Sequence, residues 1–461
     1  MLTRRRFLYH GCNAGAAAMT GAGALLQLAA ARRATAQPAG DYRALVCILL
    51  AGGNDAFNML VPADAEAHAG YAAERTDLAL PREALLPLAA TDAAGRRYGL
   101  HPGMPALQTL FDRGEAALVN NVGTLLAPVD LAAAANGSWP LPLGLFSHAD
   151  QIEQWQTAIS DARVADGWGG RLADLFADAN AATGIAMNIS LSGNNVFQSG
   201  ASVAPYAVTA NDGGAVALGG YDDDDDGGDF TRAVVDRLLA APQEALLRRA
   251  YRDSLASAIE SQQFFSAALA DAPLLATPFG ADPFGRALRQ IARIVGIREA
   301  LGATRQTFFV TVGGWDHHDD VLDNQAAMLP LIDAGLGAFR DALAELGMLE
   351  RVTTFTTSDF GRTLTSNGKG SDHGWGGHHV VMGGAVNGGR FYGDYPDIYP
   401  GNPLDVGRGI YTPTLSTDEY FAELALWFGV APGDLATVLP NVGSFYNPAS
   451  GQAPVGFLRP V

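Results

Sequence analysis

Three apolar, β-branched runs in this chain each end in acidic or histidine residues, and this repeated layout constrains the fold most. The runs are LVCILLAGGND at 45–55, TFFVTVGGWDHHDD at 307–320 and TTFTTSDF at 353–360. Continuous apolar runs of this length are typical of parallel strands buried on both faces. Because the carboxyl ends of parallel strands meet at one edge of a sheet, the acidic and imidazole groups should gather there. The pattern predicts an α/β fold with a metal site at that edge.

Helical spacing of apolar residues lies between these strands. The expected helices lie at 105–114, from 147 to 155, at 231–272 with a break at Pro242, at 283–301, at 320–349 and at 420–428, and a further strand lies at 115–123. This alternation predicts a doubly wound, mostly parallel sheet with helices on both faces. From about 187 to 282 the sequence pattern changes to short β-like segments followed by helices, so we expect an insertion there.

The first 36 residues have the pattern of a twin-arginine signal peptide. Arg4-Arg5-Arg6 forms a basic head, a mildly apolar stretch covers 11–30, and Ala34-Thr35-Ala36 supplies small residues for cleavage. The alternative is a buried N-terminal helix. We expect the twin-arginine translocation machinery to export the chain to the periplasm or the cell exterior.

The composition limits what the chain can bind. Removing the five arginines of the signal takes the net charge from −18 to −23, which disfavours nonspecific binding to nucleic acid or to anionic membranes. Only Cys47 then remains, so no intrachain disulfide is expected, and its apolar surroundings predict a core position. No later run is long and apolar enough to predict a stable membrane span.

The strand ends provide the candidate metal ligands Asp316, His318, Asp359 and His373. Residues i and i+2 share a face of an extended backbone, so we favour His318 over His317 as the partner of Asp316. Asp359 ends the next strand, and His373 lies in a glycine-bounded loop that can fold back over it. Mixed carboxylate and imidazole ligands suit Zn²⁺, Mn²⁺ or Mg²⁺, bound as one or two ions.

Ser147 and Arg362 are the candidate catalytic residues. A hydroxyl at a helix N-terminus could act as a nucleophile, since the helix dipole favours an anionic transition state. Ser147 followed by Asp150 is equally typical of an ordinary helix start, and Thr124 is an alternative nucleophile. Arg362 could bind an oxyanion through two hydrogen bonds, or pair with one of the many acidic groups.

Seven motifs together resemble a twin-arginine-exported family called domain of unknown function 1501. They are GGNDAFN, FSHADQIEQWQTA, GWGGRLAD, GGWDHH, SDFGRT, SDHGWGGHHVVMGGAVNGG and STDEYFAELALWFGV, in order through nearly all of the chain after the signal. That family is similar in architecture to the alkaline-phosphatase and sulfatase superfamily. The resemblance implies a single alkaline-phosphatase-like α/β domain over residues 37–461, with two divalent metals bridged by a nucleophile.

The resemblance also implies roles for individual residues. Asp55 resembles the carboxylate that follows the first strand and binds one metal together with Asp359. Asp316, His318 and His373 resemble the ligands of the other metal.

One departure from the superfamily concerns the second metal. Ser147 would fill the nucleophile's place, but Asp359-Phe360 stands where related phosphatases have Asp-His. Phenylalanine is no ligand, so this site would be weakened, remade with Asp372 or His378, or absent. The Cys/Ser-x-Pro-x-Arg signature of formylglycine sulfatases is also absent.

Two hypotheses of function follow. The first is an exported metal-dependent hydrolase of small anionic phosphate or sulfate esters, with attack by Ser147 or by an activated water. The second is a non-catalytic exported binding or assembly protein that retains the hydrolase fold.

Overall fold

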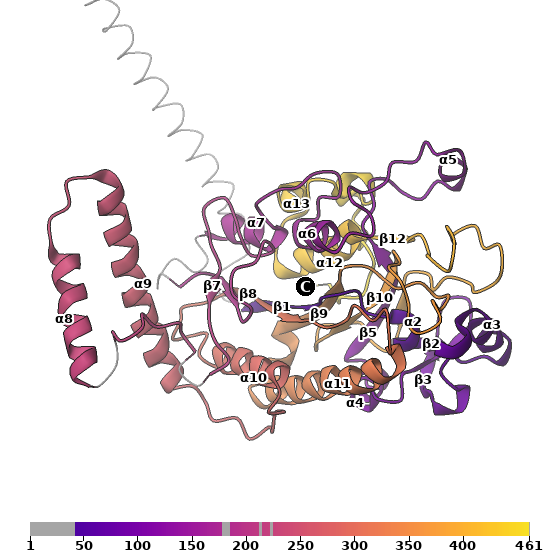
Figure 1. Ribbon diagram of the computed structural model, residues 1–461, viewed down its shortest axis with the longest axis horizontal. Helices are drawn as coiled ribbons and strands as arrows, with labels where there is room; N and C mark the ends of the chain where they lie inside the picture. The colour runs from indigo at the N-terminus through magenta and orange to yellow at the C-terminus, as the bar shows by residue number, and fades with distance from the viewer. Residues whose placement is uncertain (1–41, 178–184, 212–213, 222–224, 461) are drawn as a thin grey trace, which may run out of the picture.

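A central sheet of nine strands organises the chain in a computed structural model, which describes residues 42–177, 185–211, 214–221 and 225–460 (Figure 1). Its strands are β1 (Arg43–Leu50), β5 (Ala116–Gly123), β6 (Asn188–Ser190), β7 (Tyr206–Ala207), β8 (Arg305–Val312), β9 (Val352–Ser358), β10 (Gly377–Met382), β11 (Phe391–Tyr392) and β12 (Leu415–Ser416). The strand order is β11-β5-β10-β9-β1-β8-β6-β7, and β12 also pairs with β5. All pairings are parallel except those that β10 makes with β5 and β9.

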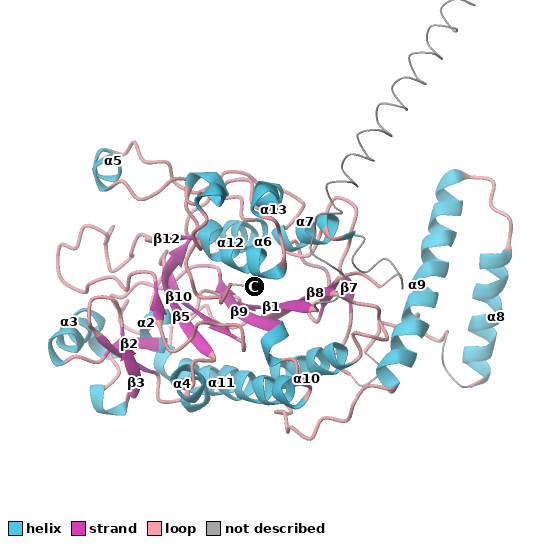
Figure 2. Ribbon diagram, turned by 180° about the vertical axis from the view of Figure 1, so that it is seen from behind, coloured by secondary structure: helices cyan, strands magenta, loops and turns pink. Residues whose placement is uncertain are grey.

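Helices cover both faces of this sheet (Figures 1 and 2). One face packs against α4 (Pro105–Asp112), α10 (Pro283–Gly296) and α11 (Val321–Glu345), and the other against α6 (His148–Thr157), α7 (Trp168–Leu175), α12 (Thr417–Phe428) and α13 (Leu435–Val438). Successive side chains of a strand point to opposite faces. In β1, Val46 and Ile48 accordingly enter the first core, and Leu45 and Leu49 enter the second.

Smaller elements lie around this body. They are α2 (Ala56–Met59), α3 (Ala65–Arg75), α5 (Leu131–Asn136), and a second sheet of β2 (Leu60–Pro62), β4 (Arg97–Leu100) and β3 (Leu86–Thr91). A hairpin of α8 (Asp226–Ala240) and α9 (Leu246–Ala270) projects from one end (Figure 1). Short 3-10 turns occur at Thr76–Leu78, Arg82–Ala84, Leu349–Arg351, Pro432–Asp434, Val442–Ser444 and Pro448–Ser450.

The predicted fold class is confirmed as a mixed α/β protein with a mostly parallel central sheet. Each predicted strand forms, and the helix expected at 231–272 divides into α8 and α9 around Pro242. Within the segment expected as an insertion, β6 and β7 join the edge of the central sheet, whereas α8 and α9 leave it. The signal at 1–36 lies outside the described residues.

The predicted core position of Cys47 is confirmed, and α12 has well-defined ends. Ser416 and Glu419 form a reciprocal capping box at the start of α12, and Gly429 ends that helix with a φ of 119°. Cys47 is a buried, free thiol in β1. Among the described helices, none has both the length and the apolar character needed to cross a membrane.

The carboxyl ends of β1, β8 and β9 lie side by side and position the site. Leu50 at the end of β1 is in register with Val312 on one side and Ser358 on the other. The loops that follow the three strands therefore leave from the same edge. Gly52 allows them to approach closely, since a Cβ there would lie 2.5 Å from the backbone nitrogen of Asp316.

Candidate metal centre

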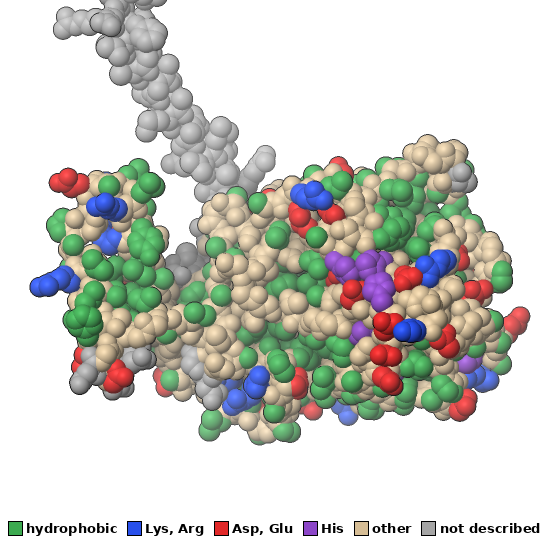
Figure 3. Space-filling view, viewed as in Figure 1, with side chains coloured by type: hydrophobic (Ala, Val, Ile, Leu, Met, Phe, Trp, Pro, Cys, Tyr) green, Lys and Arg blue, Asp and Glu red, His purple; other side chains and the backbone are tan. Residues whose placement is uncertain are grey.

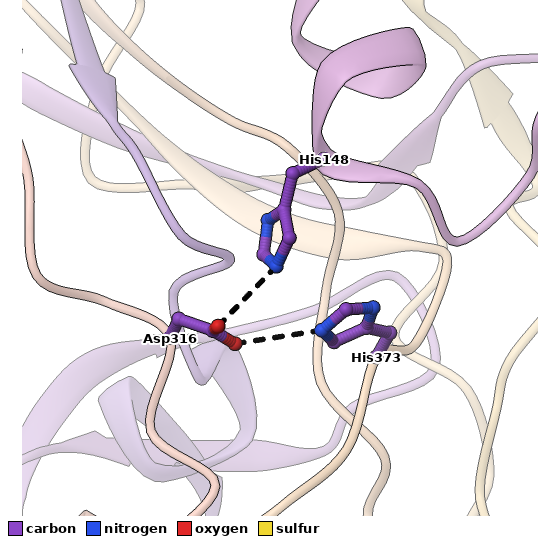
Figure 4. Close-up of side chains that lie close together, drawn as sticks. All are labelled: His148, Asp316 and His373. Atoms are coloured by element: carbon purple, nitrogen blue, oxygen red, sulfur yellow. Dashed lines mark ion pairs between the residues drawn. The ribbon is translucent and has the colours of Figure 1, made fainter.

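Three side chains from distant parts of the chain converge at this edge of the sheet. They are His148 at the first residue of α6, Asp316 in the loop after β8, and His373 in the loop before β10 (Figure 4). One ligand atom from each lies within 4.8 Å of the others. Asp316 Oδ2 is 3.4 Å from His148 Nε2, and Asp316 Oδ1 is 3.4 Å from His373 Nε2. Histidine side chains gather at this part of the molecular surface (Figure 3).

The orientation of His148 is fixed by a buried carboxylate. His148 Nδ1 lies 2.6 Å from Asp359 Oδ2, and Asp359 Oδ1 accepts a hydrogen bond from the backbone nitrogen of Gly52 at 3.0 Å. Burial raises the pKa of Asp359, while these hydrogen bonds act in the opposite direction. Toward an ionised Asp359 carboxylate, which only accepts hydrogen bonds, His148 would donate from Nδ1. The lone pair on Nε2 then faces Asp316.

His373 and His318 are oriented in the same way. His373 Nδ1 lies 2.8 Å from the carbonyl oxygen of Phe146, which only accepts, and His318 Nδ1 lies 3.0 Å from Asp372 Oδ1. Burial would raise the pKa of Asp372, but hydrogen bonds from Asn367 and neighbouring groups lower it to about 2, so this carboxylate is ionised. Each histidine can therefore donate from Nδ1, and its Nε2 is directed toward the centre.

This donor set fits a divalent ion. Two atoms bound at about 2.0–2.1 Å to one tetrahedral ion lie roughly 3.3 Å apart, close to the 3.4 Å that separates Asp316 from His148 and from His373. His148 Nε2 is buried and has no hydrogen-bond partner among the described residues, as expected of an atom that serves as a ligand. Metal-binding histidines typically donate their other ring nitrogen to a carboxylate or carbonyl, as here. The residues could hold an ion that accepts nitrogen and oxygen ligands.

Arg362 ties the loops of the centre together. Its buried guanidinium donates to the carbonyl oxygens of Gly52, Gly53 and Ser371 at 2.8–3.0 Å, and it pairs with Asp316. Burial would raise the pKa of Asp316, but the hydrogen bond and charge of Arg362 outweigh it, so this pKa is lowered. The predicted catalytic arginine thus lies at the site and positions Asp316.

Phe360 forms an apolar wall beside two of the histidines. Its ring is buried, and its centroid lies 4.9 Å from that of His148 and 4.5 Å from that of His373. Burial lowers the pKa of His373, although the hydrogen bond to Phe146 acts against this. The net lowering of this pKa favours a neutral imidazole at this position, which is the form that binds metals.

Of the predicted ligands, Asp316, His318, Asp359 and His373 come together, and Asp55 lies apart from them. The carboxylate of Asp55 is fully buried and forms an ion pair with Arg75 of α3. Asp359 contacts the centre through His148 rather than directly. The structure thus brings four of the five predicted ligands to one edge, with Asp359 in a supporting position.

The remaining candidates have structural partners. The Ser147 hydroxyl donates to Asp150, and Arg163 also pairs with that carboxylate. Thr124 is buried against Gln151. His378 lies in β10, where burial lowers its pKa to about 3 and its ring stacks on Tyr395.

His148 was not among the residues predicted for the site. The one available signal was its place next to Ser147 at a predicted helix start, where a side chain can point past the end of the helix toward a strand edge. No spacing in the sequence connects it with residues that lie 168 or more positions away.

The fold and the site together define a mixed α/β protein with a candidate metal centre at the carboxyl edge of its parallel strands. Residues 242–408 match the model of a family described as protein of unknown function (DUF1501). This match supports the resemblance to that family that the motifs indicated. The segment contains Asp316, Asp359, Arg362 and His373, whereas His148 precedes it.

The chain was also compared with curated proteins and with solved structures. No curated protein matches the chain. A solved structure, titled crystal structure of Ps i-CgsB in complex with k-i-k-neocarrahexaose, is similar at 10% identity and a TM-score of 0.35, covering 88% of this chain and 77% of that one. A score at this level supports no conclusion about fold or function.

Proposed function

We propose that the protein is an exported metal-dependent hydrolase of phosphate or sulfate esters with an alkaline-phosphatase-like fold. The observation that carries the proposal is the convergence of His148 Nε2 and His373 Nε2 on the Asp316 carboxylate. Three protein ligands with an open side are typical of catalytic rather than structural ions. The Asp316 side chain is 46% exposed, so a small substrate can reach it.

We propose one ion rather than two. In the two-metal arrangement, Asp55 would bind the second ion, but here its carboxylate is committed to Arg75. Phe360 places a ring without ligand atoms against His148 and His373. These contacts favour a single ion held by His148, Asp316 and His373, with Zn²⁺ the best match to two imidazoles and one carboxylate.

The ion, when bound, would polarise the ester oxygens and lower the pKa of a nearby water. The residues around the ion would orient its ligands and supply charge for the substrate. Asp359 and the Phe146 carbonyl hold the imidazoles of His148 and His373 in one orientation. Arg362 holds the Asp316 carboxylate in place. Arg408, which is 54% exposed and pairs with Asp372 at 2.6 Å, supplies positive charge for an anionic ester on an otherwise acidic protein.

His318 is suited to accept the proton of the attacking water. Its Nδ1 is held by Asp372, and its Nε2 lies 3.0 Å from Asp316 and 3.1 Å from His373 Nε2. The side chain is 44% exposed, so Nε2 can take up a proton from the water and pass it to solvent. We therefore propose His318 as general base, although the sequence predicted it as a ligand.

We propose water rather than Ser147 as the nucleophile. The Ser147 hydroxyl donates to Asp150, and this bond together with Arg163 lowers the pKa of that carboxylate. A carboxylate with a lowered pKa is a poor acceptor for the serine proton. Ser147→Ala should therefore retain most of the activity.

The test is turnover of aryl phosphate and aryl sulfate by protein purified without chelator and then titrated with Zn²⁺, Mn²⁺ or Mg²⁺. We expect metal-dependent turnover that His148→Ala abolishes. His68→Ala is the matched control, since His68 contacts the Leu80 carbonyl in a different part of the protein. Turnover that persists in His148→Ala, or that needs no metal, contradicts the proposal.

The second candidate function is a non-catalytic exported binding or assembly protein. Phe360 and the Asp55–Arg75 pair favour it, because both remove features of a two-metal hydrolase. One tightly bound ion without turnover of either ester would support this alternative.

A further inference from the structure

The hairpin of α8 and α9 is attached to the body at one end only (Figures 1 and 2). Phe265 and Leu269, near the end of α9, are fully buried in the core. Leu246, at the start of α9, lies 19 residues before Phe265, or about 28 Å along the helix axis. The distal half of the hairpin therefore projects into solvent.

The distal half exposes large apolar side chains. Leu238 of α8 is 62% exposed, and Leu246, Leu247 and Tyr251 of α9 are 73%, 83% and 72% exposed. Apolar side chains along this hairpin are visible in the space-filling view (Figure 3). A group of this kind on a projecting element indicates a binding surface rather than incidental exposure.

The same segment carries positive charge on an acidic protein. Residues 237–253, at the distal end, contain four arginines and two acidic residues, a net charge of +2, whereas α8 and α9 together carry no net charge and the whole chain carries −18. Arg232 and Arg252 pair with Asp229 and Asp253. Arg237, Arg248 and Arg249 are exposed and form no ion pair with any described residue.

We propose that the distal hairpin is a docking element for an anionic lipid surface. Exposed leucines and a tyrosine beside arginines are the combination with which amphipathic helices enter the interface of anionic membranes. The acidic body does not prevent this, because the Debye length is only about 8 Å at physiological ionic strength and the tip lies several such lengths from the core. The surface thereby differs from the chain as a whole, whose net charge disfavours anionic membranes.

A second copy of the chain is a less suitable occupant. Pairing two hairpin tips face to face would bring Arg248 and Arg249 of both copies together, and like charges at close range oppose association. An anionic surface instead satisfies the arginines and the apolar side chains at once. The inference does not depend on ester hydrolysis, since none of these residues lies at the metal centre.

The test is co-flotation of the purified full chain with two kinds of vesicle, phosphatidylcholine alone and an equimolar mixture with phosphatidylglycerol. We expect binding to the mixed vesicles only, weakening as salt rises. Arg248→Gln with Arg249→Gln should lower the partition coefficient about 30-fold, since each arginine near an anionic surface contributes about a factor of five. Leu246→Gln with Leu247→Gln should lower it at least about tenfold.

Matched controls separate the hairpin from general charge and apolar exposure. Leu274→Gln changes a side chain that is 97% exposed but lies outside the hairpin, and Arg113→Gln with Arg286→Gln removes two exposed arginines elsewhere. Neither control variant should differ from the parent protein in vesicle binding. Any binding by the N-terminal residues is the same in all variants, so it does not affect the comparison. Binding that is unaffected by the hairpin substitutions, that is equal on neutral vesicles, or that is absent overturns the proposal. So does a dimer in solution that the Leu246 and Leu247 substitutions dissociate.

Discussion

The Nδ1 atom of His148 lies 2.6 Å from the buried carboxylate of Asp359, so a residue predicted as a metal ligand instead orients one. The contact joins the start of α6 to the end of β9 across 211 positions of sequence. It leaves His148 Nε2, an atom without another partner among the described residues, facing Asp316. The candidate centre therefore has an inner set of ligands and an outer set of groups that hold them.

The first prediction concerns this outer set. Asp359→Asn replaces a charged acceptor by a neutral amide, so it should weaken metal binding by about 10- to 100-fold without unfolding the protein. Competition with a chromogenic chelator measures the affinity. Asp319→Asn, an exposed acid in the loop after β8, is the control and should leave the affinity unchanged. An unchanged affinity in Asp359→Asn would show that the contact does not support the site.

The second prediction separates Asp55 from the metal centre. Asp55→Ala leaves the buried Arg75 without its partner and should lower the free energy of unfolding by about 3–5 kcal/mol. Urea unfolding of metal-free protein measures this, and metal stoichiometry should not change where the variant is folded. Asp316→Ala should have the opposite pattern. This variant should lose the ion, while the free energy of unfolding of the metal-free protein should fall by less than in Asp55→Ala. Loss of metal from folded Asp55→Ala protein would instead assign Asp55 as a ligand.

The third prediction concerns His318. If its Nε2 accepts the proton of the attacking water, His318→Gln should lower kcat by about 10²- to 10⁴-fold while the ion is retained. His373→Gln is the comparison, and it should lose both the ion and the activity. Metal analysis of the two variants, beside their turnover, distinguishes a general base from a ligand. Equal loss of metal in both would make His318 a fourth ligand and favour a closed, structural site.

The fourth prediction concerns pH and Asp418 in α12. Burial, and next the charge of Glu419, raise the pKa of Asp418 to about 7, and both carboxylate oxygens lack a hydrogen-bond partner among described residues. Because the folded-state pKa exceeds the unfolded value of 3.8, the folded state holds this proton more tightly. Its contribution to stability is fully present below pH about 4 and is lost as pH rises through about 7.

Asp418→Asn tests this assignment, because an amide does not ionise. The variant should lose less stability than the parent protein between pH about 4 and 8, with a difference of up to a few kcal/mol. Urea unfolding of metal-free protein at several pH values measures both slopes. Parallel slopes for parent and variant would show that Asp418 does not titrate in this range.

The strands were predictable from sequence because each is a short apolar run that ends in glycine or an acidic residue. Asp316 and Asp359 follow directly from β8 and β9, and the parallel register brings them to one edge. The Asp55–Arg75 pair was not predictable, because no pattern indicates that the last residue of α3 turns back to the strand end. The position of His148 at the site depends on how α6 packs over the sheet, and this packing is determined by contacts between residues far apart in the sequence.

The most direct test of the metal centre is the divalent metal content of protein purified without chelator, compared with that of His148→Ala, Asp316→Ala and His373→Ala. We expect about one ion per chain in the parent protein and in His68→Ala, and none in the three ligand variants. A parent protein that binds no divalent ion under added Zn²⁺, Mn²⁺ or Mg²⁺, or ligand variants that keep the ion, would contradict it.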